Sequence, residues 1–208
     1  MHVHMRDGVQ SAKEDWESGT KSALAGGVTV VVDQPNTIPP VNTPETLRAR
    51  VFDAKEKAFC HFAINSSVTH GTPLSAMWSA GAMAFGEIFF GPSSYGEAVA
   101  PQDLKGAFDQ IHSFGGLATI HAEEVMPGPV TTLESHAQAR TPAGELRAVR
   151  AVQNANTAGC RLHFCHMSTR DSVIAASALG SVEVTPHHLF LSREQFGDGD
   201  AKGKVNPP

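Results

Sequence analysis

The sequence predicts an α/β fold, a (β/α)₈ TIM-like barrel that is incomplete, with about seven β/α units and the last strand missing. Seven short apolar runs alternate with amphipathic stretches, an order typical of parallel strands joined by helical crossovers. Residues suited to binding metal follow several of these runs, at the strand ends where such barrels carry their functional groups. The chain has 208 residues, whereas a complete barrel takes about 250.

The predicted strands are short apolar runs, because both faces of a parallel sheet are covered in this class of fold. They are His2–Met5, Val28–Asp33, Phe59–Ser66, Ala82–Phe89, Gly116–His121, Arg161–His166 and Val182–Pro186. We expect them to form one barrel domain over residues 1–208.

Helices are predicted between the strands. They are Ala12–Ala25, Pro44–Ala58, Pro101–Phe114, Pro142–Ala158 and Thr169–Leu179. The second has the clearest start, because Thr43 can cap the first amide groups and Pro44 suits the first helical position. Gly26 and Gly27 are expected to end the first helix.

Composition excludes several classes of protein. The net charge of −5 gives no basic footprint, so nucleic acid is not an expected partner. No stretch approaches the roughly 20 apolar residues of a membrane helix, and no signal peptide is recognisable. The scattered cysteines Cys60, Cys160 and Cys165 form no zinc-finger spacing and suit a reducing compartment. The sequence therefore predicts a cytoplasmic protein.

The candidate metal ligands come from four places in the chain. His2 and His4 alternate along a strand, so they point to one face and can hold one metal ion together. Glu87 lies in the fourth predicted strand, His121 ends the fifth and His166 ends the sixth. Because the carboxyl ends of barrel strands meet at one face, we expect these side chains to converge.

Imidazole and carboxylate groups are suitable zinc ligands, and a catalytic zinc keeps one position open for water. Zinc lowers the pKa of that water to about 7 and polarises carbonyl groups. This constellation favours hydrolysis of an amide-like bond with one or two zinc ions as cofactor. A structural role for each single histidine stays open as the alternative, as does pairing of Glu87 with Arg6.

Residues next to these candidates are given other roles. Asp33, which ends the second predicted strand, is expected to orient a histidine. Glu123 is expected to cap a helix or face solvent, and Cys165 to point away from the site. One of His187 and His188 is expected to line the site while the other packs.

Six stretches together resemble the amidohydrolase superfamily, and within it the class I dihydroorotases. They are His2-Val-His-Met-Arg6, Gly26-Gly-Val-Thr-Val-Val-Val-Asp-Gln-Pro-Asn-Thr37, Ile120-His-Ala-Glu123, His163-Phe-Cys-His-Met-Ser168, Thr185-Pro-His-His-Leu-Phe-Leu191 and Lys204-Val-Asn-Pro-Pro208. The resemblance implies that His2 and His4 hold one zinc ion. It implies that His121 and His166 hold a second.

The resemblance also implies a substrate site and a reaction. Arg6, Asn36 and Asn206 match substrate-contacting positions, with His4 beside them. The family reaction is the reversible conversion of N-carbamoyl-L-aspartate to dihydroorotate in pyrimidine biosynthesis. Arg6 offers a planar donor fork for the carboxylate of this small-molecule substrate. Asn36 can both donate to and accept from an amide-containing ring.

The sequence departs from the family pattern in three places. Many relatives bridge their metals with a carboxylated lysine in the fourth strand, where Glu87 is the substitute here. The catalytic Asp of the family is expected on an eighth strand, beyond Pro208. The small β-sandwich that flanks the barrel in relatives has no counterpart in residues 1–208, so we expect a fragment of the barrel enzyme.

Two alternatives stay open. One is an allantoinase-like or dihydropyrimidinase-like hydrolase, although Arg6 disfavours dihydropyrimidinase, whose substrate lacks a carboxylate. The other is a non-catalytic, dihydroorotase-like scaffold for aspartate transcarbamoylase. The expected protein partner is accordingly a second copy of the chain or that transcarbamoylase.

Overall fold

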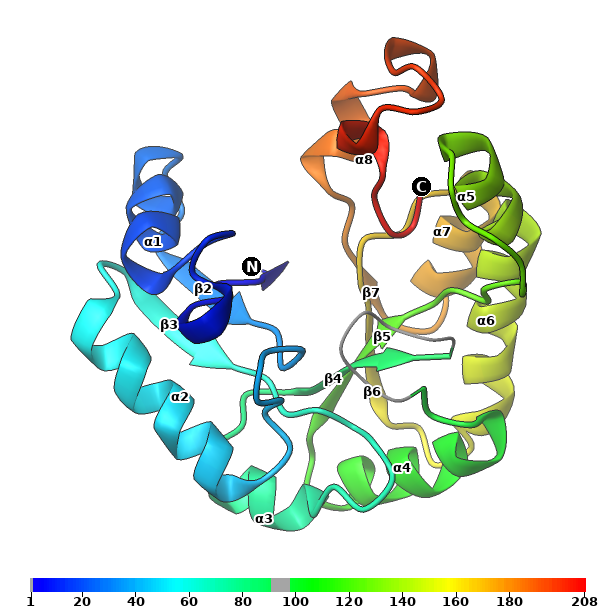
Figure 1. The fold of residues 1–208 in the computed structure, drawn as a ribbon. Helices are drawn as coiled ribbons and strands as arrows, with labels where there is room; N and C mark the ends of the chain where they lie inside the picture. The colour runs from blue at the N-terminus through cyan, green and yellow to red at the C-terminus, as the bar shows by residue number, and fades with distance from the viewer. Residues whose placement is uncertain (1, 91–97) are drawn as a thin grey trace.

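The structure is a computed structural model that describes residues 2–90 and 98–208. Its strands run parallel and in chain order, as a three-stranded sheet (β1-β2-β3) and a four-stranded sheet (β4-β5-β6-β7). A bridge between Ser66 and Phe85 links the end of β3 to β4. Figure 1 shows the two sheets curving around an open side between β1 and β7. The predicted incomplete barrel is confirmed, since the described strands do not pair across that side.

Strands and helices alternate in the predicted order. The strands are β1 (His2–Val3), β2 (Val30–Asp33), β3 (His61–Ile64), β4 (Phe85–Phe89), β5 (Leu117–His121), β6 (Arg161–Phe164) and β7 (Ser181–Val182). The α-helices are α1 (Trp16–Ala25), α2 (Pro44–Lys57), α3 (Leu74–Ser79), α4 (Pro101–Ser113), α5 (Leu133–Ala139), α6 (Pro142–Ala155), α7 (Arg170–Ser177) and α8 (Pro186–Phe190). Short 3₁₀ turns are η1 (Gly8–Gln10), η2 (Arg193–Gln195) and η3 (Ala201–Gly203).

The predicted end signals of two helices are confirmed. The hydroxyl of Thr43 accepts a hydrogen bond of 3.2 Å from the amide of Thr46, and Pro44 takes the first position of α2. Gly26 caps the end of α1, and Gly27 follows with a φ of 81°, a conformation that favours glycine.

Several predicted bounds are wrong. Pro186 does not end a strand but begins α8, because proline lacks an amide proton and suits a first helical turn. The first helix begins at Trp16, where Asp15 caps it by accepting from the amide of Ser18 at 2.7 Å. The short helices α3 and α5 were not predicted from the sequence, because two turns give too little periodicity to detect.

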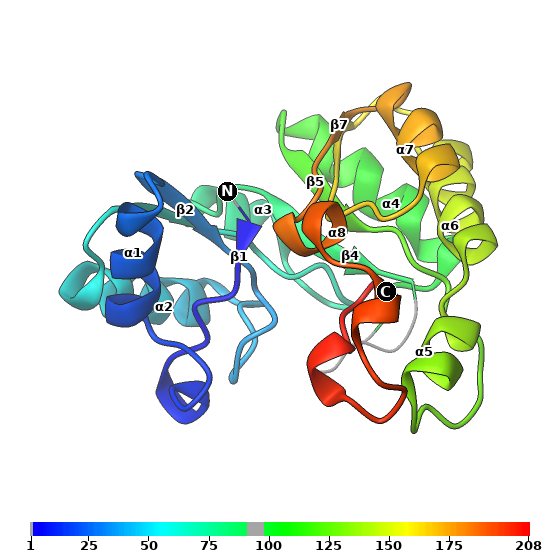
Figure 2. The same cartoon turned by 90° about the horizontal axis from the view of Figure 1, so that it is seen from above.

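The helices lie outside the curved sheets, and the core fills the layer between them (Figures 1 and 2). Fully buried side chains from both layers form one cluster, including Val31, Ile120 and Phe164 of the strands and Leu104 and Phe108 of α4. Burial of this apolar layer leaves the ends of the strands as the place for polar side chains. None of the described helices is long and apolar enough to cross a membrane.

Gly86 positions the chain for its neighbour, Glu87. It has a φ of 126°, and a Cβ built on it would lie 2.1 Å from the carbonyl oxygen of Thr119 in β5. Only a glycine combines this conformation with this close approach. The tight packing of β4 on β5 holds Glu87 next to the end of β5.

Candidate metal centre

The five predicted metal ligands converge at the ends of the strands. The Nε2 atoms of His2 and His4, both from the first strand and its end, lie 3.2 Å apart. The Nδ1 atom of His121, which ends β5, lies 3.0 Å from Nε2 of His166, which follows β6. Two nitrogens on one tetrahedral zinc, each about 2.0–2.1 Å from it, are separated by about 3.3 Å. Each pair therefore has a spacing that fits one metal ion.

Glu87 lies between the two pairs and offers one carboxylate oxygen to each. Its Oε1 is 2.6 Å from Nε2 of His166 and 3.4 Å from Nδ1 of His121. Its Oε2 is 3.7 Å from Nε2 of His2 and 3.6 Å from Nε2 of His4. The side chain is almost fully buried. Glu87 is therefore the residue that would serve both histidine pairs if each held a metal ion.

The outer nitrogens of His2 and His4 are held by other side chains. Nδ1 of His2 lies 2.6 Å from Oε1 of Glu183, which follows β7. Nδ1 of His4 lies 2.8 Å from Oδ1 of Asn36, which follows β2. Since a carboxylate and an amide oxygen only accept, each Nδ1 carries the proton and each Nε2 keeps its lone pair free for a metal.

The second pair is held differently. Nε2 of His121 lies 2.9 Å from Oε2 of Glu123, whose other oxygen forms an ion pair with Arg140 at 3.3 Å. Nδ1 of His166 is buried and has no hydrogen-bond partner among the described residues. The expectation that Glu123 faces solvent is wrong: it is 4 % exposed, because its carboxylate is held between His121 and Arg140.

The electrostatics of the cluster favour a cation. Burial would raise the pKa of Glu87, but hydrogen bonds from His121 and His166 outweigh it and hold that pKa well below its usual range. Burial would lower the pKa of His121, yet hydrogen bonds with Glu123 and Glu87 raise it to about 9. Burial lowers the pKa of His166 and lowers that of His4 to about 4. His4 and His166 are thus neutral beside an ionised Glu87, the protonation states in which these groups bind a metal, whereas His121 would release a proton on binding one.

In two groups of described residues, the potential ligand atoms all lie within 4.8 Å of one another. One group is His2, Glu87 and His166, and the other is His2, Cys165 and Glu183. The second group corrects the expectation that Cys165 points away from the site. Its turn toward Glu183 follows from the chain leaving β6 at Phe164, so that strand alternation no longer applies. Burial raises the pKa of the Cys165 thiol well above its usual value, which favours the thiol over the ligating thiolate.

Asp33 anchors the loop after β1 and does not orient a histidine, so that expectation is wrong. Its carboxylate accepts from the amide of Met5 at 2.8 Å and pairs with Arg50 of α2 at 2.8 Å. Arg50 also donates to the carbonyl oxygen of Arg6 at 2.9 Å. Both members of the pair are buried, and together they fix the backbone that leads away from His4.

Two of the predicted substrate contacts lie together. Arg6 donates to the backbone carbonyl of Asn36 at 3.3 Å, and Asn36 in turn holds His4. Asn206 is exposed on the last segment of the chain, which lies across the open side from β1 in both views (Figures 1 and 2). The structure therefore groups Arg6 and Asn36 with the metal ligands and places Asn206 on the facing side.

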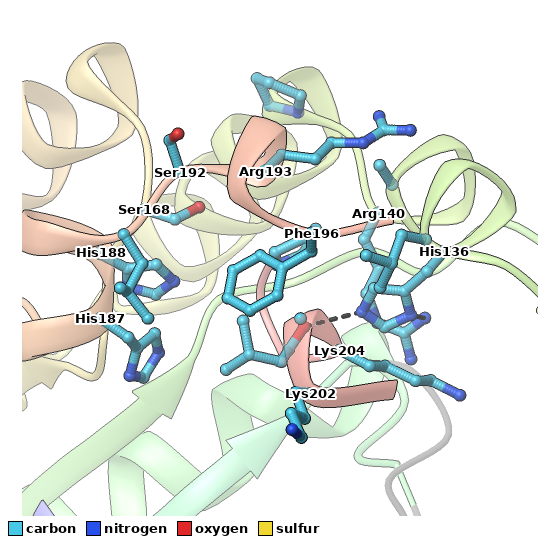
Figure 3. Close-up of a pocket in the computed structure, with 17 residues that line it drawn as sticks. His136, Arg140, Ser168, His187, His188, Ser192, Arg193, Phe196, Lys202 and Lys204 are labelled. Carbon is cyan, nitrogen blue, oxygen red and sulfur yellow. Dashed lines mark hydrogen bonds between the residues drawn. The ribbon is translucent and has the colours of Figure 1, made fainter. Parts of the chain in front are cut away.

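A cavity of about 650 Å³ lies beside that last segment (Figure 3). His187 and His188, at the start of α8, both line it and both contact the hydroxyl of Thr185 at 2.9 Å. His188 also lies 3.0 Å from the carbonyl oxygen of Pro207. The described lining of this cavity includes none of the five predicted metal ligands, so the expectation that one histidine lines the metal site while the other packs stays a prediction.

The cavity wall is cationic and connects to the metal ligands. Its described lining includes Arg140, Arg193, Lys202 and Lys204 and no aspartate or glutamate, and of these cations Arg193 pairs with Glu134 outside the lining. Arg140 extends from this wall to the ion pair with Glu123 described above. The lining thus favours anions near the open side of the barrel.

The residues that the sequence reasoning missed are the outer partners of the histidines. Glu123 could have been found, because it stands two residues after His121, the same spacing that linked His2 to His4. Glu183 carried no comparable signal, since it meets His2 only through the curvature of the sheets.

Known proteins resemble this chain in sequence and in fold. No family model matches the chain. Dihydroorotase from Methanosarcina mazei is 36 % identical over 231 residues, which cover 100 % of this chain and 50 % of that protein. Dihydroorotase from Halobacterium salinarum is 37 % identical over 215 residues, covering 100 % of this chain and 51 % of that protein. The chain thus spans about half the length of the curated relatives it matches.

Solved structures show the same fold. An L-hydantoinase (dihydropyrimidinase) from Arthrobacter aurescens superposes with a TM-score of 0.75 at 24 % identity, covering 88 % of this chain and 45 % of its own. Dihydroorotase from Saccharomyces cerevisiae, solved with 5-fluoroorotic acid, gives a TM-score of 0.73 at 16 % identity, covering 94 % and 57 %. Together with the sequence matches over the whole of this chain, these findings show that it is similar in sequence to dihydroorotases and shares its fold with a dihydroorotase and a hydantoinase.

Proposed function

We propose that this chain forms the metal-binding half of a dihydroorotase, which interconverts N-carbamoyl-L-aspartate and dihydroorotate in pyrimidine biosynthesis. The observation that carries the proposal is the pairing of four imidazole nitrogens around the two oxygens of Glu87. The similarity to dihydroorotases over the whole chain supports this reaction over that of other amidohydrolases.

We propose zinc as the metal, because imidazole and carboxylate donors in tetrahedral spacing suit it. His2 and His4 would hold one ion, His121 and His166 the other, and Glu87 both. When bound, zinc would polarise the ring amide and make water nucleophilic near neutral pH. The protein's own part is to keep His4 and His166 neutral and Glu87 ionised before the metal binds.

Substrate binding is assigned to the side chains next to His4. Arg6 presents a planar fork to the substrate carboxylate, and an arginine keeps its charge at every physiological pH. Asn36 uses its oxygen to hold His4, which leaves its amide protons for the substrate. Asn206 would contact substrate from the facing side of the opening. The cationic cavity near it supports an anionic substrate, since its field attracts negative charge.

We place the protein in the cytoplasm, where its three cysteines, which form no disulfide, suit the reducing conditions. Its predicted protein partner stays a second copy of the chain or aspartate transcarbamoylase. A scaffold role would need no metal site, so the ordered set of ligands favours the enzyme over the scaffold.

The test is a side-by-side assay of the zinc-loaded, full-length protein on dihydroorotate, allantoin and dihydrouracil. We expect turnover of dihydroorotate alone. Arg6→Lys loses the bidentate fork, so KM for the carboxylate substrate should rise about 10-fold or more. Arg48→Lys, which changes an exposed arginine of α2, is the matched control and should leave KM unchanged. Turnover of only allantoin or dihydrouracil would contradict the proposal, and an unchanged KM in Arg6→Lys would remove Arg6 from substrate binding.

A further inference from the structure

Glu183 reaches across the open side of the barrel. It follows β7, and its amide and carbonyl continue the pairing with β6 by bonding Phe164 at 3.0 Å and Met167 at 2.9 Å. Its carboxylate nevertheless contacts His2 in β1, a residue 181 positions away in the sequence. The backbone of Glu183 is thus fixed to one sheet while its side chain holds a ligand from the other.

The carboxylate contacts both proposed metal-binding pairs. Oε1 lies 2.6 Å from Nδ1 of His2 and accepts from the backbone amide of His166 at 3.2 Å. Oε2 lies 3.2 Å from Nε2 of His163 in β6, whose other nitrogen lies 2.8 Å from the hydroxyl of Ser181. Each oxygen therefore has at least one donor, which restricts rotation of the carboxylate.

These contacts decide which nitrogen of His2 faces the other ligands. A carboxylate at Nδ1 requires the proton there and leaves Nε2 with a free lone pair, directed at Nε2 of His4 and at Glu87. Without Glu183, the ring of His2 could turn about its side-chain bonds and lose this direction. The short strand β1 has only two residues, so it cannot fix the ring by packing alone.

We propose that Glu183 is a positioning residue of the metal centre, which orients His2 from the edge of the other sheet and holds it next to His166. This inference rests on the proposed metal-dependent function. It predicts that metal affinity depends on a carboxylate that does not itself bind the metal.

A competing interpretation makes Glu183 a ligand, together with His2 and Cys165. The contacts of Glu183 oppose it, because one carboxylate oxygen already accepts from the amide of His166 and the other lies 3.2 Å from Nε2 of His163. Spectroscopy separates the two interpretations, because a cysteine ligand gives Co²⁺ a sulfur-to-metal charge-transfer band and histidine or carboxylate ligands do not.

The test is zinc affinity, measured in the full-length protein by competition with a chromophoric chelator. Glu183→Gln keeps the size of the side chain but removes its charge and one acceptor. We expect zinc affinity to fall about 10- to 100-fold, the usual cost of losing a partner behind a metal ligand. Glu183→Asp keeps the charge but shortens the reach to His2, and it should weaken zinc binding as well. Urea denaturation of the metal-free variants checks that both still fold.

His163→Gln is the matched control, because it alters the other contact of Glu183 and leaves His2 untouched. Its zinc affinity should stay within about 2-fold of that of the original protein, well short of the loss expected for a partner behind a ligand.

In a His2→Ala background, Glu183→Gln should not weaken zinc binding further if it acts through His2. Unchanged affinity in Glu183→Gln overturns this inference alone, and so does a sulfur-to-cobalt band that Cys165→Ser abolishes. An unaltered protein that binds no zinc overturns the proposed function as well.

Discussion

The two histidine pairs around Glu87 are built in different ways. His2 and His4 come from one short strand and its end, and both have a side chain behind the outer nitrogen, Glu183 and Asn36. His121 ends β5 and His166 lies two residues beyond the neighbouring strand β6, and only His121 has such a partner among the described residues. The first pair depends on side chains brought from β2 and β7, whereas the second depends on the backbone of two paired strands.

This difference shows what each pair needs in order to hold its geometry. Two residues at the edge of a sheet are held by few backbone bonds, so side chains must supply the orientation. The interior strands β5 and β6 pair along four positions up to Ile120 and Phe164, and the amide of Cys165 continues this pairing to Ile120. Backbone bonds therefore lead directly to His121 and to the residue before His166. We therefore expect the zinc affinity of the first pair to depend mainly on its outer partners. That of the second pair should depend mainly on the strand pairing.

The largest effect should come from Glu87, which the two pairs share. Glu87→Gln removes the charge between all four imidazoles and should weaken zinc binding by more than about 100-fold, beyond the loss expected for an outer partner. Chelator competition should show both zinc ions lost together. If one ion stayed bound with its original affinity, the two pairs would not share Glu87.

The second-largest effect should be on the stability of the loop that follows His4, which Asp33 and Arg50 anchor. Arg50→Met leaves the buried carboxylate of Asp33 without its partner, which should lower the free energy of unfolding by about 3–5 kcal/mol. Urea denaturation of the metal-free protein measures it. Arg48→Met, at an exposed position of the same helix, should change that free energy by less than about 0.5 kcal/mol. Equal effects of the two substitutions would show that Asp33 and Arg50 do not anchor the loop.

The smallest effect should come from the outer partner of the second pair. Glu123→Gln weakens the hold on His121, and because the strands also fix this histidine, zinc affinity should fall near the lower end of the roughly 10- to 100-fold range. Glu124→Gln alters the adjacent, exposed carboxylate, which pairs with Arg147, and should have no measurable effect. A larger loss for Glu123→Gln than for Glu183→Gln would reverse the contrast between the pairs.

The order of strands and helices could be predicted from the sequence because apolar runs and capping residues are local signals. Thr43 and Pro44 start α2 where expected, and Gly26 and Gly27 end α1. The bounds of α8 could not, because the apolar run before Pro186 suits a strand as well as a loop.

The site residues, too, could be predicted only where a local sequence signal or the strand ends of the barrel indicate them. His2, His4 and His121 were predicted to converge, since a barrel brings strand ends together whatever the details of packing. Glu183 could not be predicted, because its contact with His2 depends on how far the sheets curve, which no local pattern encodes. Asp33 was misassigned because a buried carboxylate after a strand suits a histidine or an arginine equally well, and the arginine comes from a helix.

The most direct test of the central claim is an anomalous diffraction map from crystals of the full-length protein grown with zinc. We predict two zinc peaks, one at each histidine pair, with Glu87 between them and Glu183 behind His2 without contact to metal. A single peak held by His2, Cys165 and Glu183, or no peak beside Glu87, would contradict this account.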